Sequence, residues 1–417
     1  MRSPKATVWS LLATSAVLSQ GYGVMFTLIG RFRDDYGIPE SQLGIIVGVG
    51  FFTSFLGQLL IAPMADRGHA RALLLGGIGT NAGGLLIMAT STSFTGLFMG
   101  RLVMGLGIGS AYPAIRRAIA VAEPDRVGEN TGRMLSADVL GFLMGPLIAF
   151  AVVNRWGLNA PFYIGIALGA LALVLCWSVP MGAVVGDVVE SQVLAVDLLR
   201  ERWMQASVLL GVAFFAMIGT FDALWAVRIT DLVGDEQKAG PYVQLGIVIF
   251  ALPLVLLGKF GGRFVEKRGP FTVASAGLAC GVCFVSLYGL IAVPVVLILV
   301  GVVQATVDSF GAPGIPVAVT RHAPPERIAG AQGLVGAVQT LTGGVTAIVA
   351  GVLYEHFGPV PTYVATSALM AACIAAGFVL SSPYRREEND AARGACDVAV
   401  AGVPNPLPSS DRLVSRP

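Results

Sequence analysis

Long apolar runs separated by short polar segments repeat along the whole chain. Each run is about 20 residues long, which is enough to cross the hydrocarbon core of a bilayer as a helix. We predict twelve runs, at residues 8–30, 41–63, 72–91, 95–116, 134–153, 159–180, 205–227, 241–261, 271–292, 295–317, 328–351 and 360–380. The first run has no cleavage site after it, so we interpret it as a retained span rather than a signal peptide. The pattern predicts an all-α integral membrane protein with twelve transmembrane helices.

The composition points the same way. Only 12% of the 417 residues are charged, against about 25% in a soluble domain. The net charge of +2 gives no reason to expect a nucleic-acid partner. The C-x-x-C of Cys280 and Cys283 lies inside an apolar run, so neither a disulfide framework nor a metal site is expected, and no cofactor is predicted.

The basic residues orient the chain. With the N-terminus inside, the inner segments hold most of the Lys and Arg, including Arg116 and Arg117 at the end of the fourth run. The outer segments hold only Arg31, Arg33, Arg155, Arg228 and Lys238. Because cytoplasmic loops are enriched in Lys and Arg, we expect both termini in the cytoplasm and the protein in the plasma (inner) membrane.

Two segments interrupt the pattern of spans. Residues 181–203 separate a predicted N-terminal six-helix lobe (1–180) from a C-terminal one (204–385). Within this cytoplasmic linker, residues 193–203 have apolar residues at helical spacing, which predicts an interfacial helix; a plain flexible linker is the alternative. Residues 386–417 are polar and contain proline, and are predicted to be a disordered cytoplasmic tail.

The two halves resemble each other at a fixed offset. "APMADRGHAR" (62–71) matches "GRFVEKRGPF" (262–271), which pairs Asp66 with Glu266 and Arg67 with Lys267. "EPDRVGENTG" (123–132) matches "PPERIAGAQG" (324–333) at almost the same offset, about 200 residues. Six helices per unit is an even number, so both units insert in the same direction. The chain is therefore predicted to be a parallel repeat of two six-helix lobes, with substrate bound between them.

These segments resemble the major facilitator superfamily. The segment at 62–71 is similar to that family's G-x-x-x-D-R-x-G-R-[KR] signature; it keeps Asp66, Arg67 and Arg71, with Ala62, His69 and Ala70 as departures. A carboxylate at this position can pair with basic groups and with helix N-termini in one of two transporter states. We therefore interpret Asp66, Arg67, Arg71, Glu266 and Lys267 as a conformational latch. The alternative is that Arg67 and Arg71 only set the topology.

Two further motifs resemble the same family. "RLVMGLGIGSAYP" (101–113) is similar to its span-four R-x-x-x-G-x-G motif, and Gly105 and Gly109 are expected to open one helix face for close packing. "GFLMGPLIAF" (141–150) resembles the span-five signature of the drug:proton antiporter branch, with Gly141, Gly145 and Pro146 retained and the last two glycines replaced. We expect the glycines to allow packing and Pro146 to allow a kink. The resemblance implies export.

Ionisable residues inside apolar runs are candidates for function because burying them is costly. Asp308, Asp222 and Asp138 are the candidates for proton coupling, with Asp308 favoured because "FGAPGIP" (310–316) just beyond it can break the helix. The alternative for Asp308 is a buried carboxylate satisfied by a neighbouring donor. Asp222 is interpreted either as an outer gate with Arg101 or as a partner of Arg228. Asp138 is expected to join the network around Asp66 or to reach water at the inner face.

The resemblance also implies which spans face the substrate, namely one, four, seven and ten. Their polar and aromatic residues are the candidates for the cavity lining: Gln20, Tyr22, Phe26, Arg101, Tyr112, Trp225 and Gln304. Such a lining suits a lipophilic or cationic compound, although aromatic residues also occur in ordinary helix packing.

The leading hypothesis is a monomeric secondary transporter that exports small hydrophobic or cationic compounds in exchange for protons. Its partners would be the small-molecule substrate, protons and the lipid bilayer. A proton symporter or uniporter importing a small metabolite is the alternative within the same fold, and a non-transporting membrane sensor or scaffold is a more distant one. An enzyme is not expected, because the sequence offers no nucleophile with a plausible base and no nucleotide-binding loop.

Overall fold

The regular structure is helical throughout residues 3–181 and 195–388, the part of the chain that the computed structural model describes. The first lobe is built from six long helices: α1 (Pro4–Tyr36), α2 (Glu40–Leu56), α3 (Ala70–Ala89), α4 (Phe94–Ala122), α5 (Val127–Trp156) and α6 (Ala160–Cys176). Short helices η1 (Gly57–Ile61) and η2 (Ala65–His69) join α2 to α3, and η3 (Pro124–Arg126) joins α4 to α5.

The second lobe repeats this plan with one interruption. It contains α7 (Arg202–Val233), α8 (Glu236–Arg268), α9 (Pro270–Leu290), α10 (Pro294–Gly311), α11 (Gly314–His322), α12 (Ile328–Phe357) and α13 (Pro359–Leu380), with η4 (Ala195–Arg200) before α7 and η5 (Pro325–Arg327) before α12. The predicted break at 310–316 is where α10 ends and α11 begins, because Pro313 and Pro316 supply no backbone N–H to the helix.

The number of membrane spans is confirmed in part. Among the described residues, ten helical segments are long and apolar enough to cross a membrane. The other two predicted spans correspond to α6, which is apolar but 17 residues long, and to α1, which is 33 residues long. With α1 and α6 included, each lobe has six spans. By length and apolar composition alone, ten spans are supported.

Each lobe has its own buried core. One apolar cluster extends from Val8 to Val179 and the other from Ala195 to Ile374. The two cores also meet: Ala329, at the start of α12, is buried in the first cluster, and Leu59 of η1 packs against the second. The lobes are therefore in direct apolar contact at the level of these two residues.

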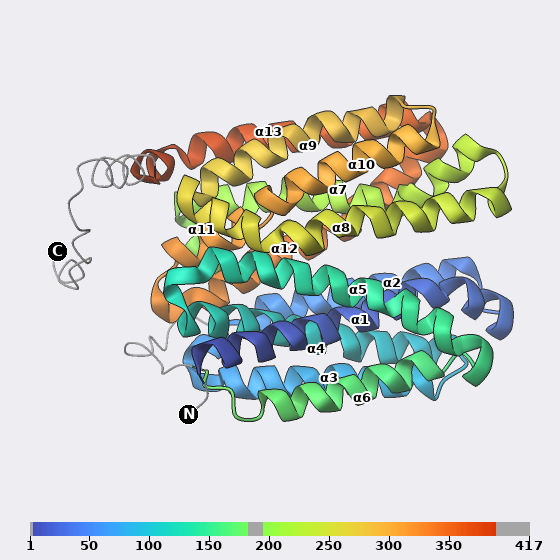
Figure 1. The fold of residues 1–417 in the computed structure, drawn as a ribbon, viewed down its shortest axis with the longest axis horizontal. Helices are drawn as coiled ribbons and strands as arrows, with labels where there is room; N and C mark the ends of the chain where they lie inside the picture. The colour runs from blue at the N-terminus through green and yellow to red at the C-terminus, as the bar shows by residue number, and fades with distance from the viewer. Residues whose placement is uncertain (1–2, 182–194, 389–417) are drawn as a thin grey trace.

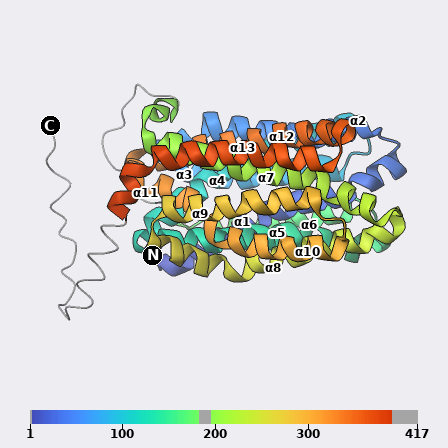
Figure 2. The ribbon, with the colours of Figure 1, turned by 90° about the horizontal axis from the view of Figure 1, so that it is seen from above.

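The lobes lie side by side, α1–α6 in blue to green and α7–α13 in yellow-green to red (Figure 1). α5 packs along α8 across the boundary, and α2 packs against α12. α1 begins and α13 ends at the same end of the bundle, which we call the terminal end; the view in Figure 2 shows the same arrangement from above. The short helices η2, η3 and η5 lie at this end as well, because every second connection between the long helices returns to it.

Glycines allow the close contacts between helices. A side chain at Gly105 or Gly109 of α4 would collide with the backbone of α2, and one at Gly141 or Gly145 of α5 would collide with the backbone of α1. α5 remains helical through Pro146. The packing role proposed for these four glycines is therefore geometrically available, between α4 and α2 and between α5 and α1.

Two non-membrane segments are partly described. Of the predicted interfacial helix at 193–203, residues 193–194 lie outside the described residues, 195–200 form η4, and α7 begins at Arg202. Residues 382–388 are helical, so the first three residues of the predicted tail belong to a helix. The Glu388 carboxylate accepts hydrogen bonds from Phe271 N (3.4 Å) and Thr272 Oγ1 (3.4 Å), and burial raises its pKa. Residues 389–417 lie outside the described residues.

Candidate functional site

A cavity of about 430 Å³ lies between the lobes. Helices α4 and α5 of the first lobe line one side of it, and α7 to α12 of the second lobe line the rest. All three predicted carboxylates, Asp138, Asp222 and Asp308, are among the lining residues. The cavity therefore brings together acidic groups that lie on α5, α7 and α10.

Asp138 is held by hydroxyl groups of the first lobe. Its carboxylate accepts hydrogen bonds from Ser15 Oγ and from Tyr112 Oη (3.0 Å), and the Tyr112 hydroxyl also bonds Ser19 Oγ (2.7 Å). Arg116, one turn beyond Tyr112 on α4, lines the same cavity. Asp138 thus belongs to a hydroxyl network with α1 and α4, and no hydrogen bond or ion pair found in the described residues joins it to Asp66.

Asp222 and Asp308 have different surroundings in the second lobe. Asp308 is 8% exposed, and Gln304, 6% exposed, lies one turn before it on α10. Asp222 is exposed to the cavity and, among the described residues, pairs with no basic side chain. Arg228 instead donates to the carbonyl oxygens of Tyr288, Gly289 and Ile291, at distances of 2.8–3.2 Å. The expected partnership of Asp222 with Arg228 is therefore not formed.

Aromatic rings form the wall beside Asp222. The Phe221 ring stacks on Trp225 (5.3 Å between centroids) and meets Phe250 edge-on (5.4 Å). Phe221, Phe250 and Tyr288 line the cavity, whereas Trp225 is 3% exposed, packs behind them and donates its indole N–H to Val243 O (3.1 Å). Trp225 supports the wall instead of lining it.

Only some of the remaining residues that the sequence predicted at the cavity line it. Tyr112 and Gln304 line it. Arg101 is fully buried inside the first lobe, with its guanidinium 4.0 Å from the Tyr22 ring centroid, and it does not pair with Asp222. Gln20 is also buried in that lobe, with no hydrogen-bond partner for its amide. The side chain of Phe26 lies outside the described part of the structure.

A second group of contacts joins the lobes at the terminal end. Asp66, 8% exposed, accepts hydrogen bonds from Arg117 Nε (3.0 Å), Ala329 N (3.0 Å) and Gly330 N (2.7 Å). The last two donors are free N–H groups in the first turn of α12, where a carboxylate is stabilised by the helix dipole. Gly68 makes the turn into α3 possible because its φ of +89° is one that other residues rarely adopt. Asp66 therefore caps a helix of the opposite lobe.

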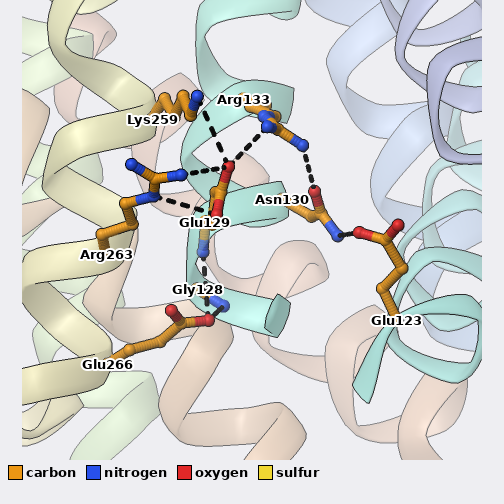
Figure 3. Close-up of polar contacts among 8 residues, drawn as sticks. All are labelled: Glu123, Gly128, Glu129, Asn130, Arg133, Lys259, Arg263 and Glu266. Carbon is orange, nitrogen blue, oxygen red and sulfur yellow. Dashed lines mark hydrogen bonds and ion pairs between the residues drawn. The ribbon is translucent and has the colours of Figure 1, made fainter. Parts of the chain in front are cut away.

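Glu266 makes the equivalent contact in the other direction. Its carboxylate accepts hydrogen bonds from Gly128 N (2.7 Å) and Glu129 N (3.2 Å), in the first turn of α5 (Figure 3). The two halves of the repeat thus exchange helix caps: Asp66, which follows α2, caps α12 of the second lobe, and Glu266, in the last turn of α8, caps α5 of the first.

The sequence interpretation missed an ion cluster beside this second cap. Glu129, 3% exposed, accepts hydrogen bonds from Arg263 Nε (2.9 Å) and Nη2 (3.2 Å) of α8, lies 3.7 Å from Lys259 Nζ, and pairs with Arg133 of its own helix (Figure 3). The cluster could have been predicted from the acidic and basic residues that lie at the same depth on α5 and α8. Charge counting assigned these basic residues to topology alone.

The basic members of the predicted latch have other roles. Arg71 donates to Val179 O (3.0 Å) within the first lobe, and Arg67 lies at the kink beside Asp66. Lys267 is exposed in the last turn of α8. Among the searched residues no group of three or more His, Cys, Asp or Glu could hold a metal ion.

Comparisons with known proteins place this geometry in context. The sequence profile of the Major Facilitator Superfamily matches residues 10–289 and 210–414. The transporter YgaY of Escherichia coli (strain K12) is 27% identical over 175 residues, and the quinolone resistance protein NorA of Staphylococcus aureus (strain MRSA252) is 26% identical over 162 residues. These alignments cover 42% and 37% of this chain, and the chain spans 44% and 40% of the length of these two relatives.

Solved structures share the fold over nearly the whole chain. The human organic anion transporter MFSD10 (TETRAN) superposes with a TM-score of 0.73 at 15% identity, covering 90% of this chain and 100% of that one. The transporter FucP, in an outward conformation, gives 0.70 at 18% identity, covering 92% and 99%.

Proposed function

Because the chain belongs to the major facilitator superfamily and is therefore a membrane transporter and not an enzyme, we propose that it exports small hydrophobic or cationic compounds in exchange for protons. The observation that carries this proposal is the interlobe cavity, which combines three carboxylates with an aromatic wall. The name of one relative, the quinolone resistance protein NorA, supports the direction of transport.

The charge of the cavity favours a cation. With Asp138, Asp222 and Asp308 ionised, Arg116 offsets one of the three negative charges and two remain in excess. The ring faces of Phe221 and Phe250 add apolar area and attract positive charge. A lipophilic cation satisfies both features, while a multiply charged anion satisfies neither.

Proton coupling is assigned to Asp308, with Asp222 and Asp138 as further candidates. Asp308 is nearly buried, lacks a basic partner among the described residues, and lies one turn before the α10–α11 break. Substrate and proton would compete for the same negative charge, so that arrival of one favours release of the other.

The latches supply the second requirement, two alternative arrangements of the lobes. Asp66 and Glu266 cap helices of the opposite lobe, so both caps must break when the terminal end opens. Arg116 lines the cavity while its neighbour Arg117 bonds Asp66, which links the occupied cavity to the latch through one turn of α4.

The same contacts support a placement in the membrane. The basic side chains Arg117, Arg263 and Arg321 gather at the terminal end, and we assign that end and both termini to the cytoplasmic side of the plasma (inner) membrane. The proposed units are a lobe of residues 1–180, a linker of 181–203, a second lobe of 204–385 and a tail of 386–417. One chain encloses the cavity, so we propose a monomer.

The test uses inside-out membrane vesicles with an acidic interior, to which lipophilic cations, antibiotics, sugars and amino acids are added singly while the internal pH is recorded. A substrate is expected to discharge the proton gradient only when the protein is present. Asp308→Asn is expected to bind that substrate, because Asp222 and the aromatic wall remain, but not to concentrate it.

Two results would contradict the proposal. If labelled compounds equilibrate without moving protons, the protein is a facilitator. If the Asp308→Asn variant pumps like the wild type, Asp308 is not the coupling residue.

A further inference from the structure

One buried polar atom on the cavity wall, the side-chain oxygen of Gln304, has no hydrogen-bond partner among the described residues. Gln304 is 6% exposed and lines the cavity, and its Nε2 donates to the Met217 sulfur at 2.7 Å. Its Oε1 is buried and receives no hydrogen bond. A buried acceptor left in this condition costs free energy, so it is expected to have a donor in some functional state.

A second glutamine on the cavity wall is a contrast. Gln332 on α12 donates its Nε2 to Pro316 O (2.7 Å) and to Thr320 Oγ1 (2.8 Å), which fixes α11 against α12. Neither of its side-chain polar atoms is buried without a partner. The unpaired oxygen of Gln304 is therefore a local feature of this wall and not a general property of the cavity's amides.

The position of Gln304 defines what the missing donor must be. Asp308 follows one helical turn later on the same face of α10, and both residues line the cavity. Both side chains therefore belong to one wall, beside the space that a cationic substrate would occupy.

Resting on the function proposed above, we propose that Gln304 makes the cavity selective for protonated amines, which carry N–H donors, over quaternary cations, which carry none. A protonated amine donates one N–H to the Gln304 oxygen and directs its charge to the adjacent carboxylate. A quaternary ammonium has the same charge but leaves the oxygen unpaired. Sites built to hydrogen-bond a substrate N–H reject analogues that lack it.

The experiment measures equilibrium binding to the full-length protein in lipid nanodiscs at neutral pH. The probes are 1-naphthylmethylamine and its N-methyl, N,N-dimethyl and N,N,N-trimethyl derivatives, all of which are cationic under these conditions. The dimethyl and trimethyl compounds are similar in size, yet only the former keeps an N–H. We expect wild-type affinity to fall by about tenfold at this last methylation, the cost of one unpaired buried acceptor.

Two variants test the residue itself. Gln304→Met keeps the shape of the side chain but removes the oxygen. The tenfold difference in affinity between the dimethyl and trimethyl compounds should then disappear. Gln304→Glu keeps an acceptor and should keep the contrast, which also guards against a Met variant that fails to fold. Equal wild-type binding of the dimethyl and trimethyl compounds, survival of the contrast in Gln304→Met, or no binding of any probe would each overturn the proposal.

These outcomes separate the inference from the proposed export function. If the contrast appears while the vesicle experiment detects no proton exchange, the amine site stands and proton-coupled export fails. If protons are exchanged and the contrast is absent, export stands and Gln304 does not select for N–H donors.

Discussion

At the residue scale, the two capping carboxylates that join the lobes differ in whether a basic side chain pairs with them. Asp66 caps α12 and also bonds Arg117, so its charge is matched within one site. Glu266 caps α5 and forms no ion pair with a basic side chain in the described part of the chain, and the adjacent Glu129 carries the ion pairs instead. Of the two capping carboxylates, Asp66 is therefore the one whose neutralisation also breaks an ion pair.

The first prediction concerns Asp66→Asn. The neutral amide loses the ion pair to Arg117 and can accept at most one of the two N–H groups of α12, and hydrogen bonds to charged groups contribute about 1.5–3 kcal/mol each. We expect the terminal end to open, raising the open population about tenfold or more. Spin labels on Arg126 and Pro325, which are exposed in opposite lobes, would record the longer distance.

The matched control is Asp35→Asn, which breaks an exposed pair with Arg31. The distance distribution of this variant should equal that of the wild type. An unchanged distribution in Asp66→Asn would show that the cap does not hold the lobes closed.

The residues of the latch were more predictable than those of the cavity. Asp66 and Glu266 stood out because a repeat preserved a carboxylate at a helix end, a place with free N–H groups. Arg116 and Arg117 were assigned to an inner loop because an apolar run ends there, yet α4 continues to Ala122. Arg101 was expected at the cavity, but sequence spacing cannot tell a face that meets the cavity from one that meets Tyr22.

At the scale of elements, α5 and α8 form the closest contact between the lobes. A side chain on Gly132 would collide with the carbonyl of Gly258, and one on Gly128 would approach the carbonyl of Gly262 at 2.5 Å. Small residues at four-residue spacing let two helices approach closely in a membrane. Interlobe closure at the terminal end therefore depends on the absence of side chains as well as on the ion cluster around Glu129.

The second prediction is that Gly132→Val shifts the protein toward the arrangement open at the terminal end. The added carbons cannot be placed without moving α5 away from α8, and overpacking costs about 1–3 kcal/mol. The measurement is the distance between the same two spin-labelled sites. Gly344→Val is the comparison, because a side chain there meets nothing within 4 Å; an equal effect in both variants would refute the steric explanation.

The linker element η4 supports a third prediction, on pH. Asp197 accepts two hydrogen bonds from Arg327 (2.5 Å each), and this contact lowers the pKa of the Asp197 carboxyl. A lowered pKa means that the pair stabilises the fold above the unfolded-state pKa of about 3.9 and is lost as the pH falls through the folded-state value. Asp197→Asn should cost about 1 kcal/mol or less at pH 7, because the pair is partly exposed.

Thermal unfolding in detergent would measure this effect, as a melting temperature lowered by roughly two degrees at pH 7. The difference from the wild type should begin to shrink below about pH 4 and should vanish only below the lowered folded-state pKa of Asp197, where the carboxylate is protonated in both states. Asp125→Asn, an exposed acidic residue in η3, should show no difference at either pH. A difference that persists in acid would mean that Asp197 acts through packing.

At the scale of the whole molecule, one helix, α4, contributes to both the cavity and the latch. Arg116 and Arg117 are adjacent on α4, yet one lines the cavity and the other bonds Asp66 at the lobe interface. The repeat and the twelve runs predicted two lobes from sequence because helix length and charge are local properties. Which of two neighbouring arginines faces which site depends on how the lobes pack, and that is not local.

The last prediction compares these two arginines directly. Arg116→Gln removes the cation that offsets one of the three cavity carboxylates, so a cationic substrate should bind up to about tenfold more tightly, as expected for one unit charge at about 10 Å and an effective dielectric of about 20. Its release should slow in consequence, and turnover should fall. Arg117→Gln leaves the cavity charge unchanged and weakens the latch, so substrate affinity should stay near wild type while the labelled sites at the terminal end separate. Binding and transport would be measured on both variants. Equal changes in affinity would mean that cavity charge and latch are not separable along α4. Weaker substrate binding by Arg116→Gln would mean that the substrate is an anion.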